Sequence, residues 1–284
     1  MFTIKIENVR NNVLTLTQNE SYYQVINVDG LNPPKAQINS SRVAGLDGSK
    51  FNSSKLEERN IVIYIRLNGN VEANRIYLYS FFRTKEWCKF YYKNGLRDVF
   101  IEGYVESCEV ALFTNNEIMQ VSIICPNPYF QNINEIVDDI SKALSAFKFP
   151  FAINSPIPFS TLSLDRVTTV FNDSSSENGM TIHIEIFGNV NKIRIVNVGS
   201  GEWFTVRGSF IANDSIVINT NKGDKSIRLF RNAVESNIFT GIQKGSTFFQ
   251  LQAGNNSFSY LADDGASDDI VHIEFRHRDM YRGV

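Results

Sequence analysis

The sequence predicts a mainly β protein with a minor α component, organised in two domains. Three observations predict this. Short segments that alternate apolar and polar residues, rich in β-branched and aromatic side chains, recur along the whole chain. Only two segments, both in the first half, repeat apolar residues at helical spacing. Beyond position 175, short strand-like segments follow one another closely without such spacing, which is typical of a β-sandwich of jelly-roll type.

Length and charge restrict the class of protein further. The chain has 284 residues, enough for two domains, and a formal net charge of −2. Its basic and acidic residues are balanced in both halves, so we expect neither a nucleic-acid nor a membrane partner. The opening residues, MFTIKIENVR, lack the apolar core of a signal peptide, and no apolar stretch approaches the roughly 18 residues of a membrane span. We therefore expect a soluble protein made in the cytosol.

Strands of the first half are separated by turn residues. Asn11-Asn12, Asp29-Gly30 and Asn94-Gly95 indicate tight turns. Proline cannot donate a ladder hydrogen bond, so the last of these strands ends at Pro126. The predicted strands cover residues 2–9, 12–17, 22–31, 61–67, 88–93, 97–113 and 119–126.

Two helices are predicted in the first half. Residues 71–87 place Val71, Leu78, Phe81 and Phe82 on one face. Residues 133–147, INEIVDDISKALSAF, give the strongest helical signal, because their apolar residues form one stripe that ends before the proline of KFPF. The stripe consists of Ile136, Ile140, Ala143, Leu144 and Phe147.

The character of the sequence changes after this second helix. Residues 149–175 contain prolines and serines and are interpreted as a crossover, so the predicted domains are 1–148 and 149–284. The second domain is predicted to contain eight strands. They cover residues 181–188, 192–198, 203–210, 214–220, 226–231, 247–254, 256–262 and 270–277.

No group of residues indicates catalysis, a metal or a cofactor. The three cysteines, Cys88, Cys108 and Cys125, are widely spaced and are predicted to be buried free thiols. His272 and His277 are five residues apart, which places them on opposite faces of a strand, so they cannot share a metal unaided. The acidic segment DDGASDD misses the spacing of a calcium loop and is interpreted as a hairpin tip. We therefore predict a protein that is not an enzyme.

The segment GLDGSK, residues 45–50, resembles a phosphate-binding loop only superficially. A P-loop has the order G-x-x-x-x-G-K-[ST] and opens a helix, whereas here the spacing is shorter and a strand-like run follows. We interpret Gly45, Asp47 and Gly48 as turn residues.

Several motifs, in order along the chain, resemble the siphophage-type distal tail protein family. They are the G-x-D-G turn at Gly45–Gly48, the strand that starts at Arg59, a helix with Arg75 and Leu78, the boundary segment CPNPYF, and the later segments GSGEWFTV, DSIVINT and FFQLQAGNNSFSY. The resemblance covers the chain from about Val25 to Tyr260. One departure is Asn191-Lys192, where the family usually has Asn-Pro.

The resemblance implies a function in assembly. It implies an N-terminal ring-forming domain, a galectin-like C-terminal sandwich and a homohexameric ring at the tail tip or baseplate of a virion. The implied partners are other copies of the chain, the tail tube protein, the tail hub or tail-associated protein and, as a further candidate, a receptor-binding protein. The loop that contains Gly45, Asp47 and Gly48 would be an arm that reaches a neighbour, and Arg59 would pair with a carboxylate of that neighbour or with Glu57 or Glu58 of its own chain.

An alternative hypothesis is a carbohydrate-binding module that acts in host-surface recognition. Galectin-like sandwiches can bind sugars through aromatic side chains, and Trp203 is the candidate platform. The other interpretation of Trp203 is a core or interface residue.

Overall fold

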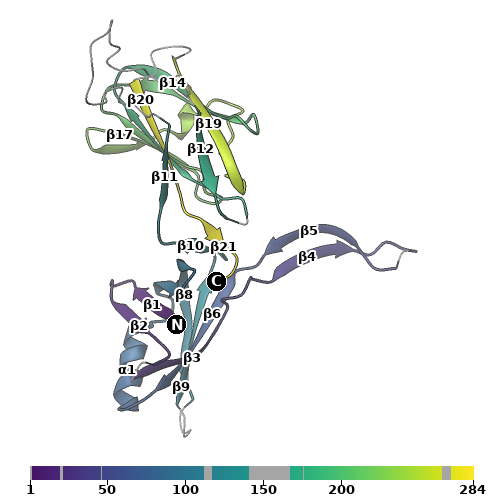
Figure 1. Cartoon of the computed structure of the whole chain (residues 1–284), viewed down its shortest axis with the longest axis vertical. Coiled ribbons are helices and arrows are strands. Elements are labelled where there is room, and N and C mark those ends of the chain that lie inside the picture. Colours follow the sequence, from purple (N-terminus) through teal and green to yellow (C-terminus); the bar gives the residue numbers. More distant parts are fainter. Residues whose placement is uncertain are drawn as a thin grey trace, which may run out of the picture. The chain divides into compact units, whose positions relative to one another are not determined.

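The computed structural model describes residues 2–19, 22–45, 47–111, 117–140, 167–174, 176–263 and 270–284. Contacts divide the chain into two compact units, whose elements are labelled in Figure 1. Unit 1 comprises Met1–Ile133 and Met280–Val284, and unit 2 comprises Asn134–Asp279. The chain therefore passes between the units twice. The predicted domain boundary, between residues 148 and 149, lies outside the described residues.

Unit 1 is built on a nine-stranded sheet. Seven strands follow the order β2-β1-β7-β8-β9-β6-β3, while β10 pairs with β8 and β21 pairs with β10. The backbone N–H of Val25, in β3, donates to the carbonyl of Thr17, the residue after β2, at 3.2 Å. This hydrogen bond connects the chain at β2 and at β3, the first and last strands of the order. The strands are β1 Thr3–Asn8, β2 Val13–Leu16, β3 Tyr23–Asp29, β6 Arg59–Leu67, β7 Trp87–Lys93, β8 Asp98–Val110, β9 Ile118–Cys125, β10 Phe130–Asn132 and β21 Met280–Tyr281.

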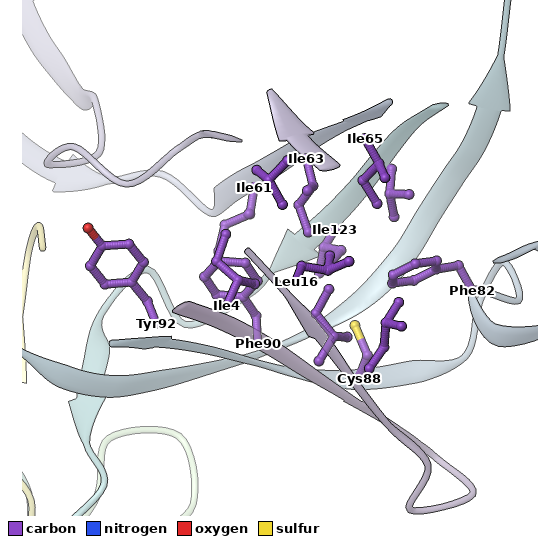
Figure 2. Close-up of a cluster of buried hydrophobic side chains, with 14 of the residues drawn as sticks. Ile4, Leu16, Ile61, Ile63, Ile65, Phe82, Cys88, Phe90, Tyr92 and Ile123 are labelled. Carbon is purple, nitrogen blue, oxygen red and sulfur yellow. The ribbon is translucent and has the colours of Figure 1, made fainter. Parts of the chain in front are cut away.

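The core of unit 1 is formed by the side chains that point to one face of each strand. In β6, Ile61, Ile63 and Ile65 are fully buried while the residues between them are not, because successive side chains point to opposite faces. Figure 2 shows these isoleucines facing Leu16 and Phe90 within the core. Of the cysteines, Cys88 and Cys125 are buried and Cys108 is half-buried, and all three are free thiols. Burial raises the pKa of each thiol to about 12.

The first predicted helix is confirmed as α1, Val71–Phe81. The side chain of Asn70 caps it by accepting from the backbone N–H of Ala73 at 3.2 Å, and Glu72 lies in the first turn, where the helix dipole favours an acid. The helix ends earlier than position 87, and Lys85 has a left-handed φ of 70°, which a helix cannot contain. Leu78 and Phe81 are its buried residues.

Unit 2 is a sandwich of two antiparallel sheets, as the strand-rich second half predicts. Phe258 of one sheet stacks on Phe275 of the other with ring centroids 4.8 Å apart, inside a shared apolar core. The sheets have the orders β11-β20-β13-β16-β17-β18 and β12-β19-β14-β15. The strands are β11 Ile136–Asp139, β12 Val167–Asn172, β13 Thr181–Ile186, β14 Val190–Asn197, β15 Trp203–Phe210, β16 Ser215–Asn219, β17 Ser226–Arg231, β18 Val234–Asn237, β19 Gly254–Ala262 and β20 Val271–His277, and a 3-10 turn, η1, covers Phe239–Gly241.

The second predicted helix, 133–147, is wrong over the residues that the structure describes. Ile136–Asp139 form strand β11, which pairs with β20 from Ile136↔His277 to Asp139↔Glu274. This pairing places residues 134–140 in unit 2, so the described contacts change unit at Asn134, earlier than the predicted boundary. Residues 141–147 of the predicted helix lie outside the described residues.

Two further predictions for unit 2 need correction. The segment 247–254 was expected as a strand, but it forms only an isolated bridge between Leu251 and Asn178 before β19 begins. Strand β12 lies in the segment 149–175, which was expected to be a crossover, and it pairs with β19. Both differences arise from partners that are distant in the sequence.

The stability of unit 2 should fall in mildly acidic solution. His277 is buried, its Nε2 lies 3.2 Å from the carbonyl of Phe171, and burial lowers its pKa despite the nearby carboxylates of Asp279, Asp138 and Glu135. An unfolded histidine has a pKa of about 6.5, so below that pH the unfolded state binds the additional proton. We expect the free energy of unfolding of unit 2 to decline as pH falls below about 6.5, and His277 alone contributes at most about 1.4 kcal/mol per pH unit to this decline.

Thermal unfolding at a series of pH values between about 7.5 and 5.5 measures this effect, since most carboxylates titrate lower. His277→Gln should flatten the pH dependence without removing it, because burial also lowers the pKa of His183. An unchanged slope in His277→Gln would contradict the assignment.

Candidate functional site

The most exposed element of unit 1 is the β-hairpin of β4 (Ala36–Ser41) and β5 (Lys50–Leu56). We call residues 36–56 the arm. Its strands pair only with each other, and every described residue of the arm is exposed except Leu56, which is half-buried. In Figure 1 the arm is a separate ribbon that extends away from the sheet of unit 1. Along the chain it follows β3 and precedes β6. The loop that was predicted to project is therefore a β-hairpin.

The tip of the arm contains the predicted glycine turn. Gly45 and Gly48 both have left-handed φ, +83° and +86°, and a Cβ added to either would meet nothing within 4 Å. Glycine adopts this conformation without the cost that other residues incur. Asp47 is exposed between them, and Leu46 lies outside the described residues. Because strand β5 and not a helix follows, the turn lacks the helix N-terminus of a phosphate-binding loop.

Substitution at the tip should weaken assembly more than folding. Gly45→Ala with Gly48→Ala imposes a left-handed conformation on two alanines, at a cost of about 1–2 kcal/mol each. Because a Cβ at either glycine meets no described atom within 4 Å, we expect the melting temperature of unit 1 to change little. If the chain forms the ring that the resemblance implies, we expect the fraction of chains in that ring to fall. Light scattering and thermal unfolding measure the two quantities.

The matched control is Gly95→Ala, in the β7–β8 turn, where an added Cβ also meets nothing within 4 Å and no left-handed φ is imposed. An intact ring with a lowered melting temperature would make the tip a structural turn only. Saturable ATP binding that the double substitution removes would instead restore the phosphate-loop hypothesis.

One face of the arm carries two exposed apolar side chains. Ile38 pairs with Ser54, and Ser40 pairs with Phe51 across a bulge after Asn39. Ile38 and Ser40 lie on the same face of β4, and residues paired across the hairpin share a face, so Ile38 and Phe51 lie on one face of the arm. Their exposed fractions are 65% and 61%. An isolated two-stranded hairpin is marginally stable in water, so a partner that covers these side chains and the free strand edges would stabilise it.

The arm is also basic. Residues 36–56 contain Arg42, Lys50 and Lys55 but only one acidic residue, Asp47. All four side chains are exposed. A complementary surface would therefore combine apolar area with carboxylates, which favours a protein surface of mixed character.

Arg59 is placed inside unit 1, at the base of the arm. It is 2% exposed, and its Nε donates to the carbonyl of Pro128 at 2.8 Å. Its Nη1 donates to the carbonyls of Gly30 and of Asn32, the latter at 2.7 Å, and its Nη2 donates to the carbonyl of Arg282 at 2.5 Å. Burial lowers the pKa of this guanidinium.

These contacts change the interpretation of Arg59. The structure pairs its side chain with backbone carbonyls of its own unit, and no ion pair with Glu57 or Glu58 is found among the described residues. A role of Arg59 in assembly stays a prediction. The sequence gives no signal for these contacts, because the four carbonyls come from segments up to 223 positions away.

Trp203 is half-buried at the start of β15, in unit 2. The guanidinium of Arg194 lies 4.5 Å from its ring centroid, which covers one ring face. A Cβ added to Gly245 would lie 3.3 Å from the ring, so the backbone at Gly245 also lies close to the Trp203 ring. These neighbours favour the packing interpretation of Trp203, and the sugar-platform hypothesis stays a prediction.

Metal-ligating groups do not gather within the described ranges. There, no three side chains among His, Cys, Asp and Glu are placed to hold a metal ion. Residues 264–269, most of the acidic DDGASDD segment, lie outside those ranges. In the part of the chain that the structure covers, no helix is long and apolar enough to cross a membrane.

Comparisons with known proteins give one family and one shared fold. Residues 173–279 match the family described as the siphovirus-type tail component, C-terminal domain. The whole chain is similar to the crystal structure of the Dit protein of phage SPP1, with a TM-score of 0.70 and 14% identity over 98% of this chain and 99% of that one. It is also similar to a chain of the phage P2 baseplate in its activated conformation, with a TM-score of 0.52 and 10% identity over 100% of both chains. No curated protein matches the sequence.

The resemblance to siphophage-type distal tail proteins is thereby confirmed. The family match lies within unit 2, and the shared fold extends over both units. At these identities the likeness to SPP1 Dit and to the P2 baseplate chain establishes the fold.

Proposed function

From a tail-component domain in unit 2 and a Dit-like fold over the whole chain, we propose that this protein is a structural component of a phage tail tip or baseplate. The observation that carries the proposal is the match of residues 173–279 to the siphovirus-type tail component family, together with the SPP1 Dit fold over 98% of this chain. SPP1 Dit is described as a paradigm of the hub adsorption apparatus in phages that infect Gram-positive bacteria. In this proposal the chain occupies the corresponding place in its own particle.

The proposed assembly is a homohexameric ring. A ring of identical copies requires a head-to-tail interface in which one surface contacts a different surface of the next copy. The arm supplies the first surface, because it extends as an otherwise unpaired hairpin with Ile38 and Phe51 exposed. Covering each of these side chains on a neighbour would contribute about 1.5–3 kcal/mol.

The proposed partners are the tail tube protein above the ring, the tail hub or tail-associated protein below it and a receptor-binding protein as a further candidate. Gly45, Asp47 and Gly48 are proposed to shape the tip of the arm that crosses to the neighbour. A structural role accounts for the chain without catalysis, a cofactor or a bound metal.

Immunoelectron microscopy tests the location. Antibodies raised against residues 173–279 should place gold at the distal end of the tail in particles that contain this protein. Label along the tube or at the capsid would contradict the proposed function.

The competing function, carbohydrate binding by unit 2, is tested separately. If Trp203 is a sugar platform, Trp203→Ala should remove binding of the full chain to a glycan array or to host cell walls. A glycan signal that Trp203→Ala removes would favour recognition, whereas no signal would leave the assembly function as the better supported one.

A further inference from the structure

The arm has a defined base, which we call the root. The root consists of residues 30–35, which lead into β4, and residues 57–60, which follow β5. The backbone N–H of Glu57 donates to the carbonyl of Lys35 at 3.4 Å, so the two sides of the root are adjacent. A Cβ at Gly30, whose φ is +89°, would lie 2.1 Å from the carbonyl oxygen of Asn60, so only glycine allows this close approach.

Arg59 connects three segments at the root. Its backbone belongs to the chain leaving the arm, and its guanidinium bonds to Gly30 and Asn32 on the chain entering the arm. The same guanidinium bonds to Pro128, which follows β9, and lies 4.5 Å from the ring centroid of Phe130.

The third segment is the C-terminus of the chain. The carbonyl of Arg282 accepts from Arg59 Nη2, and the N–H of Val284 donates to the carbonyl of Leu31 at 3.2 Å. A Cβ at Gly283 would lie 2.9 Å from Cδ of Pro33 and 3.1 Å from its nitrogen. The C-terminal residues therefore pack directly on the chain that enters the arm.

Because all three segments bond to the single guanidinium of Arg59, a shift of one segment affects its contacts with the other two. A buried guanidinium needs its donors satisfied, and among the described residues Arg59 forms no ion pair, so carbonyl oxygens satisfy it. The planar guanidinium holds its donors at fixed angles, so the three segments must keep one relative arrangement to accept from it. Displacing any one segment leaves a buried N–H without an acceptor.

We propose that Arg59 and the C-terminal residues Arg282–Val284 form a latch that fixes the direction in which the arm leaves unit 1. Arg59 is then a positioning residue: it contacts no neighbouring copy, and it acts through the root. The consequence for ring formation rests on the proposed function of the arm, whereas the latch itself does not.

A distance measurement on the full chain tests the latch directly. Spin labels at Ser49→Cys in the tip and Thr15→Cys in β2, both exposed sites within unit 1, report the arm direction by double electron–electron resonance. Cys108→Ser removes the half-buried thiol, and the buried Cys88 and Cys125 are protected from labelling. Dilute protein keeps the chain monomeric during the measurement.

Gly283→Val separates the C-terminal residues from Pro33 without changing Arg59, and Arg59→Met removes the guanidinium while keeping its volume. We expect both variants to lose the narrow tip-to-sheet distance distribution of the parent chain. Gly95→Val, at a site where an added Cβ meets nothing, is the matched control and should keep it. Gly283→Val decides the question if Arg59→Met fails to fold.

A narrow, unchanged distribution in folded Gly283→Val would overturn the latch, even if its melting temperature falls. The ring fraction of the same variants is measured separately. A broadened distribution with an undiminished ring would support the latch and contradict the role of the arm in assembly, so the two proposals fail in different ways.

Discussion

Removal of the arm should abolish the ring and leave both units folded. In the test variant an Asn-Gly turn replaces residues 36–56. The carbonyl of Lys35 and the N–H of Glu57 are already hydrogen-bonded, so a two-residue turn can close the shortened hairpin. The arm shares no strand pairing with the sheet of unit 1, so its loss should not disturb the core shown in Figure 2.

Light scattering measures the oligomer and circular dichroism the fold of this variant. A milder variant, Ile38→Ser with Phe51→Ser, should lower the ring fraction by about fivefold or more, as expected for the loss of at least 1 kcal/mol at each interface. Leu96→Ser is the matched control, because Leu96 is 94% exposed at the tip of another hairpin. A chain without the arm that still forms the ring would show that other surfaces assemble it.

Disruption of the core of unit 2 should leave the ring intact. Phe258 is fully buried between Phe249 and Phe275, with ring centroids at 5.4 and 4.8 Å. Phe258→Ala should cost about 3–5 kcal/mol of stability, since the removed ring leaves a cavity. For a unit of this size that corresponds to a fall of roughly 10 °C in the melting temperature of unit 2.

The ring is expected to persist in this variant at temperatures where unit 2 has begun to unfold, because the arm and its root belong to unit 1. Phe171→Ala is the control, since Phe171 is exposed on β12 of the same unit. Loss of the ring together with unit 2 would assign assembly to unit 2 in place of unit 1.

Local sequence patterns predicted those strands and the helix in which buried residues recur at one regular spacing. β6, β13 and α1 bury one face each, so the spacing of Ile61, Ile63 and Ile65 and of Leu78 and Phe81 reports the structure directly. The same spacing misleads at Ile136 and Ile140. They are four positions apart, which suits one face of either a helix or a strand, and pairing with β20 decides the outcome.

The arm and the latch show what sequence alone cannot supply. β4 and β5 are exposed on both faces, so their sequences, AQINSS and KFNSSKL, carry no alternation of burial from which the strands could be recognised. The glycine turn at the tip could be predicted because Gly45 and Gly48 determine it locally. The position of Arg59 depends on Arg282 and Pro128, which only the folded chain brings together.

The measurement that tests the account most directly is the mass and shape of the purified full chain. Native mass spectrometry with negative-stain electron microscopy should show a closed ring of about 194 kDa, six times the 32.3 kDa of one chain, with sixfold class averages. The same preparation without residues 36–56 should contain single chains. A full-length protein that stays monomeric at concentrations up to those of tail assembly, or a ring that survives removal of the arm, would contradict the account.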